Sequence, residues 1–351
     1  MSRRVRTAAA ACRLTMDWLT TTASRLLEQL VAVLRYPIVP EQRLFYLYVL
    51  SSLGFALVLY LRSEQRDDDV AQGTGLMRGL ARFVFPPAVW SHSSAWVDVR
   101  YFVPHQMLRL WIYSQVVVAA AVGGNLAVTG FFQSAFGEPG LVPATQGSLP
   151  MIAAYTLASV VALDFSAFLM HLCQHKFPLL WAFHKVHHSA EVLHPLSNYR
   201  EHPVDNVCYA LVTGSSLGMV NAGFAFVFNV TPQALVTPLL GIGLAGFLYN
   251  ILGYHLRHSH LWLRWPGVWV YVFGCPAHHQ IHHSCEPQHI DRNFAFVLPV
   301  WDVIFGTFYM PSDRDPLTFG LGDGSEPKYK SLWSLYTLPF IDLAKRVRLW
   351  H

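Results

Sequence analysis

The chain has 351 residues, of which 53% are hydrophobic and 13% are charged, and its formal net charge is +4. Soluble domains carry about a quarter charged residues, so this composition excludes an ordinary soluble protein, and the small, dispersed positive charge excludes a nucleic-acid partner. The five cysteines show no CxxC spacing, so they indicate no disulfide framework. The composition therefore predicts a membrane protein.

The N-terminal segment 1–43 is rich in arginine. Residues 14–34 carry apolar side chains at helical spacing with polar residues between them, a pattern that predicts an amphipathic helix lying in the membrane interface. A transit peptide is the alternative, because such peptides are also rich in arginine and poor in acids.

Five apolar segments follow, and each is about as long as a membrane-spanning helix requires. The last two are separated only by Thr231 and Pro232, which predicts a tight helical hairpin. The fold class expected is therefore all-α, a multi-span helical membrane bundle. The predicted spans are 44–61, 107–131, 149–172, 207–230 and 232–254.

Lys and Arg predict the orientation of the bundle. Segments 62–104, 173–206 and 255–351 are basic, whereas 132–148 and the hairpin tip are not, so the positive-inside rule places the basic segments in the cytoplasm. The arginine-rich segment 1–43 would then lie outside, unless 44–61 is re-entrant or the interfacial helix does not follow the rule. Every histidine-rich segment is expected on the cytoplasmic side.

Histidine is concentrated in one part of the chain, with 15 of the 18 histidines between positions 171 and 289. Their spacings of three and four residues place rings on one face of a helix. Imidazole is a neutral ligand that suits iron, copper, zinc and nickel. The clusters are His171 and His175; His184, His187 and His188; His255, His258 and His260; and His278, His279, His282 and His283.

Eight to ten converging histidines exceed the four ligands of a structural metal site, so the clusters predict two metals. His255 and His258 are alternatives, since both can face the site and at least one is expected to do so. His202 lies in a loop and is a further candidate. His194, His260, His278 and His289 are interpreted as bystanders.

Asp164 is a carboxylate inside an apolar span, seven residues before His171 on the same helix face. A charge in this position is costly unless it has a partner or a function. We expect it to accept a ring N–H from a ligand histidine without binding metal itself. A hydrogen bond between packed helices is the alternative.

The order HxxxH, HxxHH, an isolated histidine region and HxxHH resembles the fatty acid hydroxylase / sterol desaturase superfamily, in particular its bacterial-type branch. The flanking residues match as well: Leu163-Asp164-Phe165, Tyr199-Arg200-x-His202-Pro203, Asp291-x-Asn293-Phe294 and Trp301-Asp302 through Gly306-Thr307. The metal ligands implied by the resemblance are His171, His175, His184, His187, His188, His279, His282 and His283, with His202 and His258 completing the set.

The resemblance implies a cytoplasmic, histidine-rich dimetal cap that holds two iron ions, for which zinc can substitute. It also implies O₂ as co-substrate, a lipid-like substrate and an external electron donor of ferredoxin or cytochrome type with its reductase. The expected division is an interfacial segment 1–43, a membrane-embedded hydroxylase domain 44–311 and a cytoplasmic tail 312–351. The expected location is a bacterial inner membrane.

The predicted reaction is hydroxylation or desaturation of a C–H bond in a sterol, fatty acyl, sphingoid or carotenoid substrate. A histidine-rich membrane metal transporter is one alternative, but its site is expected near the middle of the bilayer. A zinc-dependent membrane hydrolase is the other. The chain has no HExxH motif, and Glu191, Glu201 and Glu286 lie outside the histidine clusters.

Overall fold

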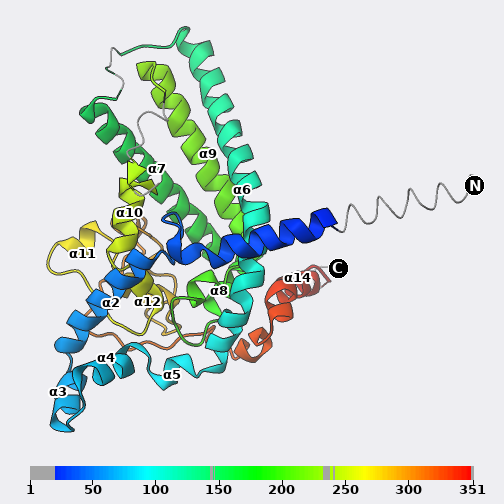
Figure 1. The fold of residues 1–351 in the computed structure, drawn as a ribbon. Helices are drawn as coiled ribbons and strands as arrows, with labels where there is room; N and C mark the ends of the chain where they lie inside the picture. The colour runs from blue at the N-terminus through cyan, green and yellow to red at the C-terminus, as the bar shows by residue number, and fades with distance from the viewer. Residues whose placement is uncertain (1–19, 143–144, 146, 232–237, 240–241, 349–351) are drawn as a thin grey trace, which may run out of the picture.

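Three long helices dominate the computed structural model, which describes residues 20–142, 145, 147–231, 238–239 and 242–348. They are α6 (Ser93–Phe136), α7 (Leu149–Lys176) and α9 (Pro203–Phe228), and they stand side by side as a bundle (Figure 1). Each is long and apolar enough to cross a membrane. The predicted all-α, multi-span membrane fold is thereby confirmed, and the chain is an integral membrane protein.

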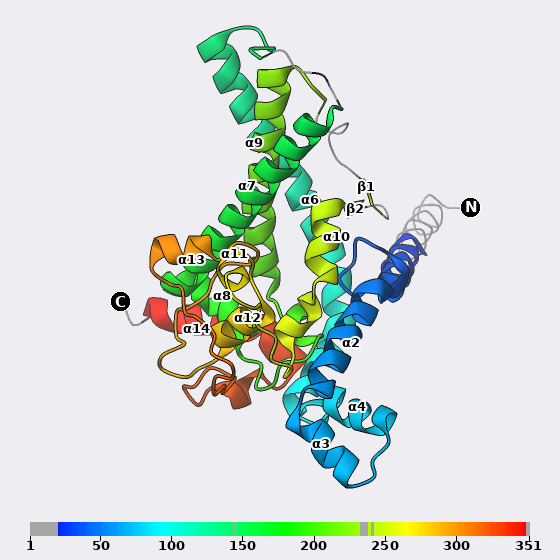
Figure 2. The same ribbon diagram turned by 90° about the vertical axis from the view of Figure 1, so that its left-hand side faces the viewer.

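Shorter elements gather at the lower end of the bundle and form a compact cap (Figures 1 and 2). They are η1 (Tyr36–Ile38), α2 (Tyr46–Leu61), α3 (Glu64–Ala71), α4 (Leu76–Val84), α5 (Pro87–Trp90), α8 (Pro178–His188), η2 (Ser197–Tyr199), α10 (Leu244–Ile251), η4 (Tyr254–His258), α11 (Trp269–Val272), α12 (Pro276–His283), α13 (Val300–Phe305), η5 (Glu326–Tyr329) and α14 (Leu332–Arg348). The two-residue strands β1 (Pro238–Leu239) and β2 (Ile242–Gly243) pair antiparallel.

Proline sets the starts of the helices that carry or support histidines. Pro178, Pro203 and Pro276 occupy the first turn of α8, α9 and α12, where the missing N–H has no intrahelical partner in any case. At the far end of α9, Asn229 adopts a left-handed conformation with φ 50°, which ends the helix. The sequence thus fixes where each helix begins relative to its histidines.

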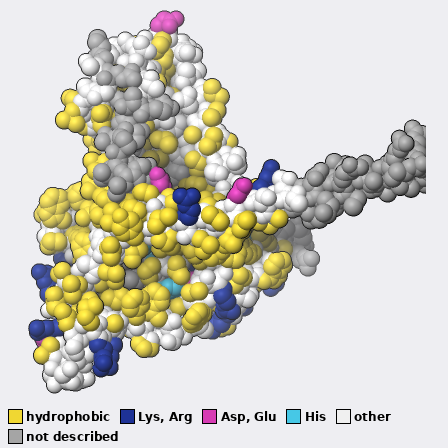
Figure 3. Space-filling model, in the orientation of Figure 1, with side chains coloured by type: hydrophobic (Ala, Val, Ile, Leu, Met, Phe, Trp, Pro, Cys, Tyr) yellow, Lys and Arg dark blue, Asp and Glu magenta, His cyan; other side chains and the backbone are white. Residues whose placement is uncertain are grey.

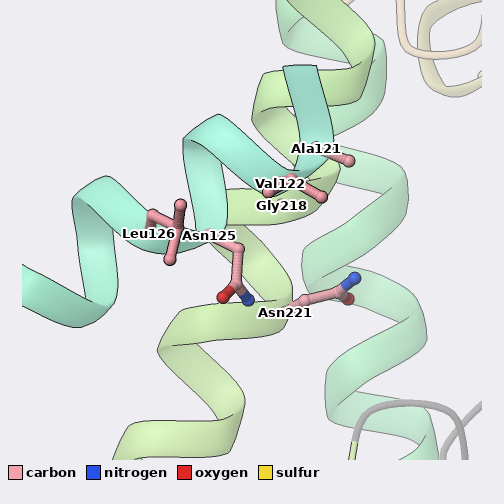
Figure 4. Close-up of a pocket in the computed structure, with 6 residues that line it drawn as sticks. All are labelled: Ala121, Val122, Asn125, Leu126, Gly218 and Asn221. Carbon is pink, nitrogen blue, oxygen red and sulfur yellow. The ribbon is translucent and has the colours of Figure 1, made fainter. Parts of the chain in front are cut away.

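The contact between α6 and α9 depends on glycines. A Cβ atom on Gly218 would collide with the backbone carbonyl of Ala121, and one on Gly214 would lie 2.6 Å from the carbonyl oxygen of Val117. Figure 4 shows Gly218 directly beside Ala121 and Val122. Small residues let the backbones of membrane helices approach closely, so these glycines determine the position of α9 along α6.

The residues before α2 include a helix over 20–34. In Figure 1 it runs crosswise to the long helices, and it exposes Leu26, Leu27 and Leu34. This is the shape expected of an interfacial helix. Residues 14–19 of the predicted helix lie outside the described residues.

Two predicted spans differ from the structure. Segment 44–61 forms α2, which has 16 residues and bends by 69° into α3, so the pair counts at most as one broken span. Of the predicted span 232–254, residues 244–251 form α10, whose eight residues extend about 12 Å. The prediction of a continuous helix as the second arm of the hairpin was therefore wrong. Residues 232–237 and 240–241 lie outside the described residues.

The reason for the second error is local. Pro238 lacks an N–H and pairs in a short hairpin, and Gly253 turns the chain with φ 82° just after α10. Hydrophobicity alone does not distinguish such a broken apolar segment from a continuous helix.

The C-terminal segment, expected as a tail, packs against the cap. Tyr329 and Leu335 are buried with Val97 and Val186. The Lys185 ammonium donates to the Asp342 carboxylate at 2.8 Å. Residues up to Asp342 therefore pack against the cap and contact α8.

The surface of the cap is not an ordinary soluble surface. On the face drawn in Figure 3, hydrophobic side chains extend from the bundle over much of the cap. Lys and Arg lie at the level of the N-terminal helix and below it. On this face, the Lys and Arg side chains thus lie toward the end that contains the cap.

Candidate metal centre

Nine histidines form two adjacent groups inside the cap, and in each group the ring nitrogens lie within 4.8 Å of one another. The first group is His171, His175, His184, His188 and His282, and the second is His187, His258, His279 and His283. They come from the end of α7, from α8, from η4 and from α12. No carboxylate of the described residues belongs to either group.

Each HxxHH motif contributes to both groups. On α8, His184 and His188 belong to the first group and His187 to the second, while on α12, His282 belongs to the first and His283 to the second. Neighbouring residues on a helix point about 100° apart, because one turn takes 3.6 residues. We expected each motif to direct three rings into one space; instead, each connects the two sites.

Backbone carbonyls orient several rings. His171 Nδ1 lies 2.8 Å from the carbonyl oxygen of Phe294, His282 Nδ1 lies 2.9 Å from that of Arg292, and His187 Nδ1 lies 3.2 Å from that of Arg200. A carbonyl can only accept, so Nδ1 carries the proton. Nε2 then presents a lone pair, which is the tautomer that a metal ligand needs.

Polar side chains orient three more rings in the same way. Asp205, in the first turn of α9, lies 3.2 Å from His184 Nδ1. Asp291 lies 3.5 Å from His175 Nδ1, and Ser197 Oγ lies 2.9 Å from His258 Nδ1. These contacts hold the ligand nitrogens toward the interior of each group.

The donor atoms fit metal ions. The Nε2 atoms of His175, His184, His188 and His282 are buried and have no hydrogen-bond partner within the described part of the chain. In the second group, His279 Nε2 lies 2.9 Å from His258 Nε2 and 3.1 Å from His283 Nε2. Buried nitrogens in such numbers are normally satisfied, and a cation at the centre of each group would satisfy them.

The rings are also in the correct protonation state. Burial lowers the pKa of His282 to about 3, and it lowers the pKa values of His188 and His283 well below the usual range for histidine. Burial acts in this direction because it disfavours the charged imidazolium. At neutral pH these rings are neutral and available as ligands.

Asp164 does not contact His171 as expected. Its carboxylate accepts hydrogen bonds from the backbone N–H groups of Val297 and Leu298, both at 2.9 Å, and from the indole of Trp301 at 3.0 Å. It therefore holds the loop whose Phe294 carbonyl orients His171. A positioning role for Asp164 would therefore act through the loop and not through a direct contact with the ring of His171.

Asp302 secures the same loop. It accepts from the N–H groups of Phe294 and Ala295 at 2.8 and 2.9 Å and from the Thr307 hydroxyl at 2.7 Å. Asp164 thus holds segment 293–302 against α7, and Asp302 fixes the conformation within it. The sequence motif around Trp301 and Asp302 is explained by this loop and not by direct metal binding.

We expect Asp164→Asn to lower turnover by about 10-fold or more without removing both metals. An amide cannot accept three hydrogen bonds as a carboxylate does, so the loop and His171 lose their orientation, and losing an outer partner of a ligand costs about 10–100-fold. Metal content and turnover measured on the same purified sample test this expectation. Full activity would show that Asp164 serves only helix packing.

Another buried network supports the second group. The Arg200 guanidinium pairs with the Asp98 carboxylate, which also lies 2.9 Å from His194 Nε2. Arg200 further donates to the Ser94 carbonyl at 2.7 Å. The network fixes the loop before α9, and with it the Arg200 carbonyl that orients His187.

Several histidines lie outside both groups. His202, a predicted ligand, caps α9 by accepting from the Val204 N–H at 3.1 Å, and its Nε2 lies 3.1 Å from the Tyr336 carbonyl. Both of its nitrogens are therefore engaged, which corrects the ligand assignment. Of the alternatives in η4, His258 belongs to the second group and His255 does not. The bystanders His194, His260, His278 and His289 also lie outside.

Sequence reasoning missed Asp205, Asp302 and Asp98. Asp205 had a weak signal, because it follows Pro203 just before the predicted span 207–230, and an acid near the start of a helix is favourable. Asp302 stood in a recognised flanking motif without an assigned role. Asp98 had no signal, since its partners Arg200 and His194 lie about a hundred residues away in the chain.

Two buried, all-histidine groups at the end of a membrane bundle define the class: a membrane protein with a candidate dimetal centre. Residues 156–307 match the family model described as fatty acid hydroxylase, and this segment contains all nine histidines of the two groups. This segment therefore matches the family that the histidine motifs of the sequence resemble.

The curated relatives act on lipids by name. Alkylglycerol monooxygenase of Danio rerio is 29% identical over 47% of this chain and 33% of its own length. Ornithine lipid hydroxylase OlsE of Rhizobium tropici is 26% identical over 49% of this chain and 46% of its own length. Cholesterol 25-hydroxylase of Homo sapiens is 29% identical over 48% of this chain and 57% of its own length. The match thus spans between 33% and 57% of the length of these relatives. No solved structure matches the chain.

Proposed function

We propose that the protein is a di-iron membrane oxygenase that hydroxylates or desaturates a lipid, using O₂ and external electrons. The observation that carries the proposal is the pair of buried histidine groups without a carboxylate, placed where a lipid-facing bundle meets the cap. The names of the relatives, which are monooxygenases and hydroxylases of lipids, support the reaction class.

The chain's own residues would supply position and a dry environment. His171, His175, His184, His188 and His282 would hold one iron, and His187, His258, His279 and His283 the other. Bound iron supplies activation of O₂ and removal of hydrogen from an unactivated C–H bond. The carbonyl and carboxylate partners keep the rings from rotating, and burial keeps bulk water from the reacting carbon.

The alternatives fit the geometry less well. A transporter site is expected on broken helices near the middle of the bilayer, whereas both groups are built from the C-terminal end of α7 and from the cap elements α8, η4 and α12. A zinc hydrolase needs an open site with a nearby carboxylate base. Asp205 and Asp291 contact the Nδ1 atoms of His184 and His175, on the side of each ring that faces away from its group. Neither carboxylate is therefore placed as the base of a hydrolase.

We expect two iron ions per chain after anaerobic purification. The two groups offer five and four nitrogens, which suit two transition metals, and zinc replaces iron in overexpressed protein where zinc is available. Metal analysis against protein concentration measures the ratio. A single metal per chain, or two metals that persist in His187→Ala and His282→Ala, would contradict the proposal.

The substrate class follows from a comparison of cellular lipids. Extracts from cells with and without the gene should differ by a lipid that gains one oxygen or loses two hydrogens. The electron donor, proposed to be a ferredoxin or cytochrome with its reductase, can then be tested in reconstitution. Unchanged lipids under conditions in which the protein holds iron would oppose the proposal.

We also propose that the cap faces the cytoplasm of a bacterial cell. The basic segments lie at the cap end, and the opposite end of α6 is followed by the single acid Glu138 without Lys or Arg nearby, as the positive-inside rule requires. Cysteines introduced at Gly140 and Thr231 should be labelled from outside and one at Ser325 only from inside. Labelling of positions 231 and 325 from the same side would overturn the topology.

A further inference from the structure

A second polar cluster lies beside the metal centre, where the segment after the N-terminal helix meets α6 and η2. Arg109 donates to Gln106 Oε1 at 3.4 Å, and the Tyr36 hydroxyl donates to the same oxygen at 3.3 Å. Phe102 packs against both Tyr36 and Tyr199. We call this group the interfacial arginine cluster, and its members are Tyr36, Arg43, Gln106, Arg109, Tyr199 and Glu201.

Several donors in the cluster have no partner. Gln106 Nε2, Arg109 Nε and the Tyr199 hydroxyl are buried and without a hydrogen bond in the part of the chain that the structure describes. Gln106 is 0% exposed and Tyr199 is 2% exposed. Buried donors are normally satisfied by protein, water or a ligand, and here three of them come from two separate elements, α6 and η2.

The charges of the cluster do not balance. Arg43 Nη1 lies 4.0 Å from Glu201 Oε1, and Glu201 Oε2 accepts from the Asn206 amide at 2.6 Å. Burial alone would raise the pKa of Glu201, but Arg109 and Arg43 outweigh it and the pKa is lowered. Glu201 is therefore ionised and offsets one guanidinium. One positive charge remains, together with the unpaired donors, and both favour an oxyanion.

The cluster lies at the expected depth of lipid head groups. Between Arg109 and Glu138, α6 and the residue after it contain no charged side chain, and this stretch is about 40 Å long at 1.5 Å per residue. A hydrocarbon core measures about 30 Å, so Arg109 lies at its boundary. The side chains of Arg43 and Glu201 are 36% and 24% exposed, so the cluster opens to the surface.

The same backbone turn serves both sites. In η2, the Ser197 hydroxyl contacts His258 of the second histidine group, and two residues later Tyr199 faces the cluster. The next carbonyl, that of Arg200, orients His187, and Glu201 follows it. A head group held in the cluster is therefore next to the second histidine group.

We propose that the interfacial arginine cluster binds the anionic oxygens of a lipid head group, phosphate or carboxylate, and so places the first carbons of the chain beside the second histidine group. The substrate role rests on the proposed function, but the binding does not. Arg43 and Arg109 would pair with the anion, and Gln106 and Tyr199 would donate to its oxygens.

The test is a binding titration of the full-length, metal-loaded protein in a non-ionic detergent. Dioctanoyl phosphatidic acid is the anionic probe, dioctanoylglycerol the neutral one and inorganic phosphate the free anion. We expect phosphatidate to bind. Tyr199→Phe should weaken its affinity about 5-fold, as expected for the loss of a neutral hydrogen bond. Arg109→Gln should weaken it by about 10-fold or more, as expected for the loss of a charged one. Arg43→Gln, at the surface of the cluster, should behave like Arg109→Gln.

Two controls separate binding from folding. Tyr199→Phe removes a hydroxyl that has no partner among the described residues, so the thermal unfolding midpoint should not fall. Arg100→Gln removes an exposed arginine of the same helix, whose guanidinium bonds only the Trp96 carbonyl among described residues. It should leave the affinity unchanged.

Three results would overturn the proposal: unchanged affinity in both Tyr199→Phe and Arg109→Gln, equal binding of dioctanoylglycerol, or equal binding of inorganic phosphate, which would indicate a site for small anions. Metal content and turnover measured in parallel keep the two proposals apart. Phosphatidate binding that depends on Tyr199, in a protein that holds no iron, would support the cluster and contradict the oxygenase. An active oxygenase whose variants bind phosphatidate with unchanged affinity would support the oxygenase and contradict the cluster.

Discussion

Replacing His282 by alanine should reduce turnover at least about 100-fold while the protein still inserts into the membrane. His282 is held by the Arg292 carbonyl at 2.9 Å, and its Nε2 lies buried and unpaired within the described residues of the first group. Losing only an outer partner of a ligand costs about 10–100-fold, so losing the ligand costs more. His282 lies on α12 in the cap, so it contributes no bilayer contact.

His187→Ala is the matched variant for the second group and should have the same effect. His260→Ala is the control, because His260 is exposed, belongs to neither group and contacts the Phe83 carbonyl at 2.7 Å. Metal content, membrane fractionation and turnover should be measured for all three variants. Near-normal turnover in His282→Ala or His187→Ala would show that the ligand assignment is wrong.

Gly218→Val should prevent the bundle from assembling. Its side chain would occupy the space of the Ala121 backbone carbonyl, and backbone cannot move aside as a flexible side chain can. Overpacking costs about 1–3 kcal/mol even where neighbours can adjust. We expect aggregated or degraded protein, detected as loss of the monodisperse peak after extraction in mild detergent.

Gly223→Val supplies the control on the same helix. A Cβ atom at Gly223 meets nothing within 4 Å among the described residues, so this variant should extract and elute as the unmodified protein does. If Gly218→Val eluted in the same way, α6 and α9 would not be in the close contact that the structure shows.

Local patterns made much of this molecule predictable. Apolar length located α6, α7 and α9, and spacing of three and four residues located eight of the nine grouped histidines, with His258 as an open alternative. The division of each HxxHH motif between two groups was not predicted. It depends on the angle at which α8 and α12 face each other, which no spacing within one helix encodes.

The errors share a cause. Asp164 was assigned to His171 because the two lie on one helix, but its partners are two backbone N–H groups and the indole of Trp301, all more than 130 residues away. The second arm of the hairpin was predicted from hydrophobicity alone. The short helix α10 and the turn at Gly253 are apolar as well, so hydrophobicity did not reveal the break in the helix. Long-range partners and breaks in apolar segments both depend on tertiary contacts, and a single sequence shows neither.

The glycine contact between α6 and α9 also determines where a carboxylate that contacts His184 lies. Gly218 lies 13 residues after Asp205 on α9, about 20 Å along the helix, and Asp205 orients His184. A slip of α9 by one turn would move that carboxylate by about 5.4 Å and release the ring. The position of α9 along α6 therefore determines the position of the Asp205 carboxylate. A substitution at the glycine contact can misplace the ring of His184 without touching that residue.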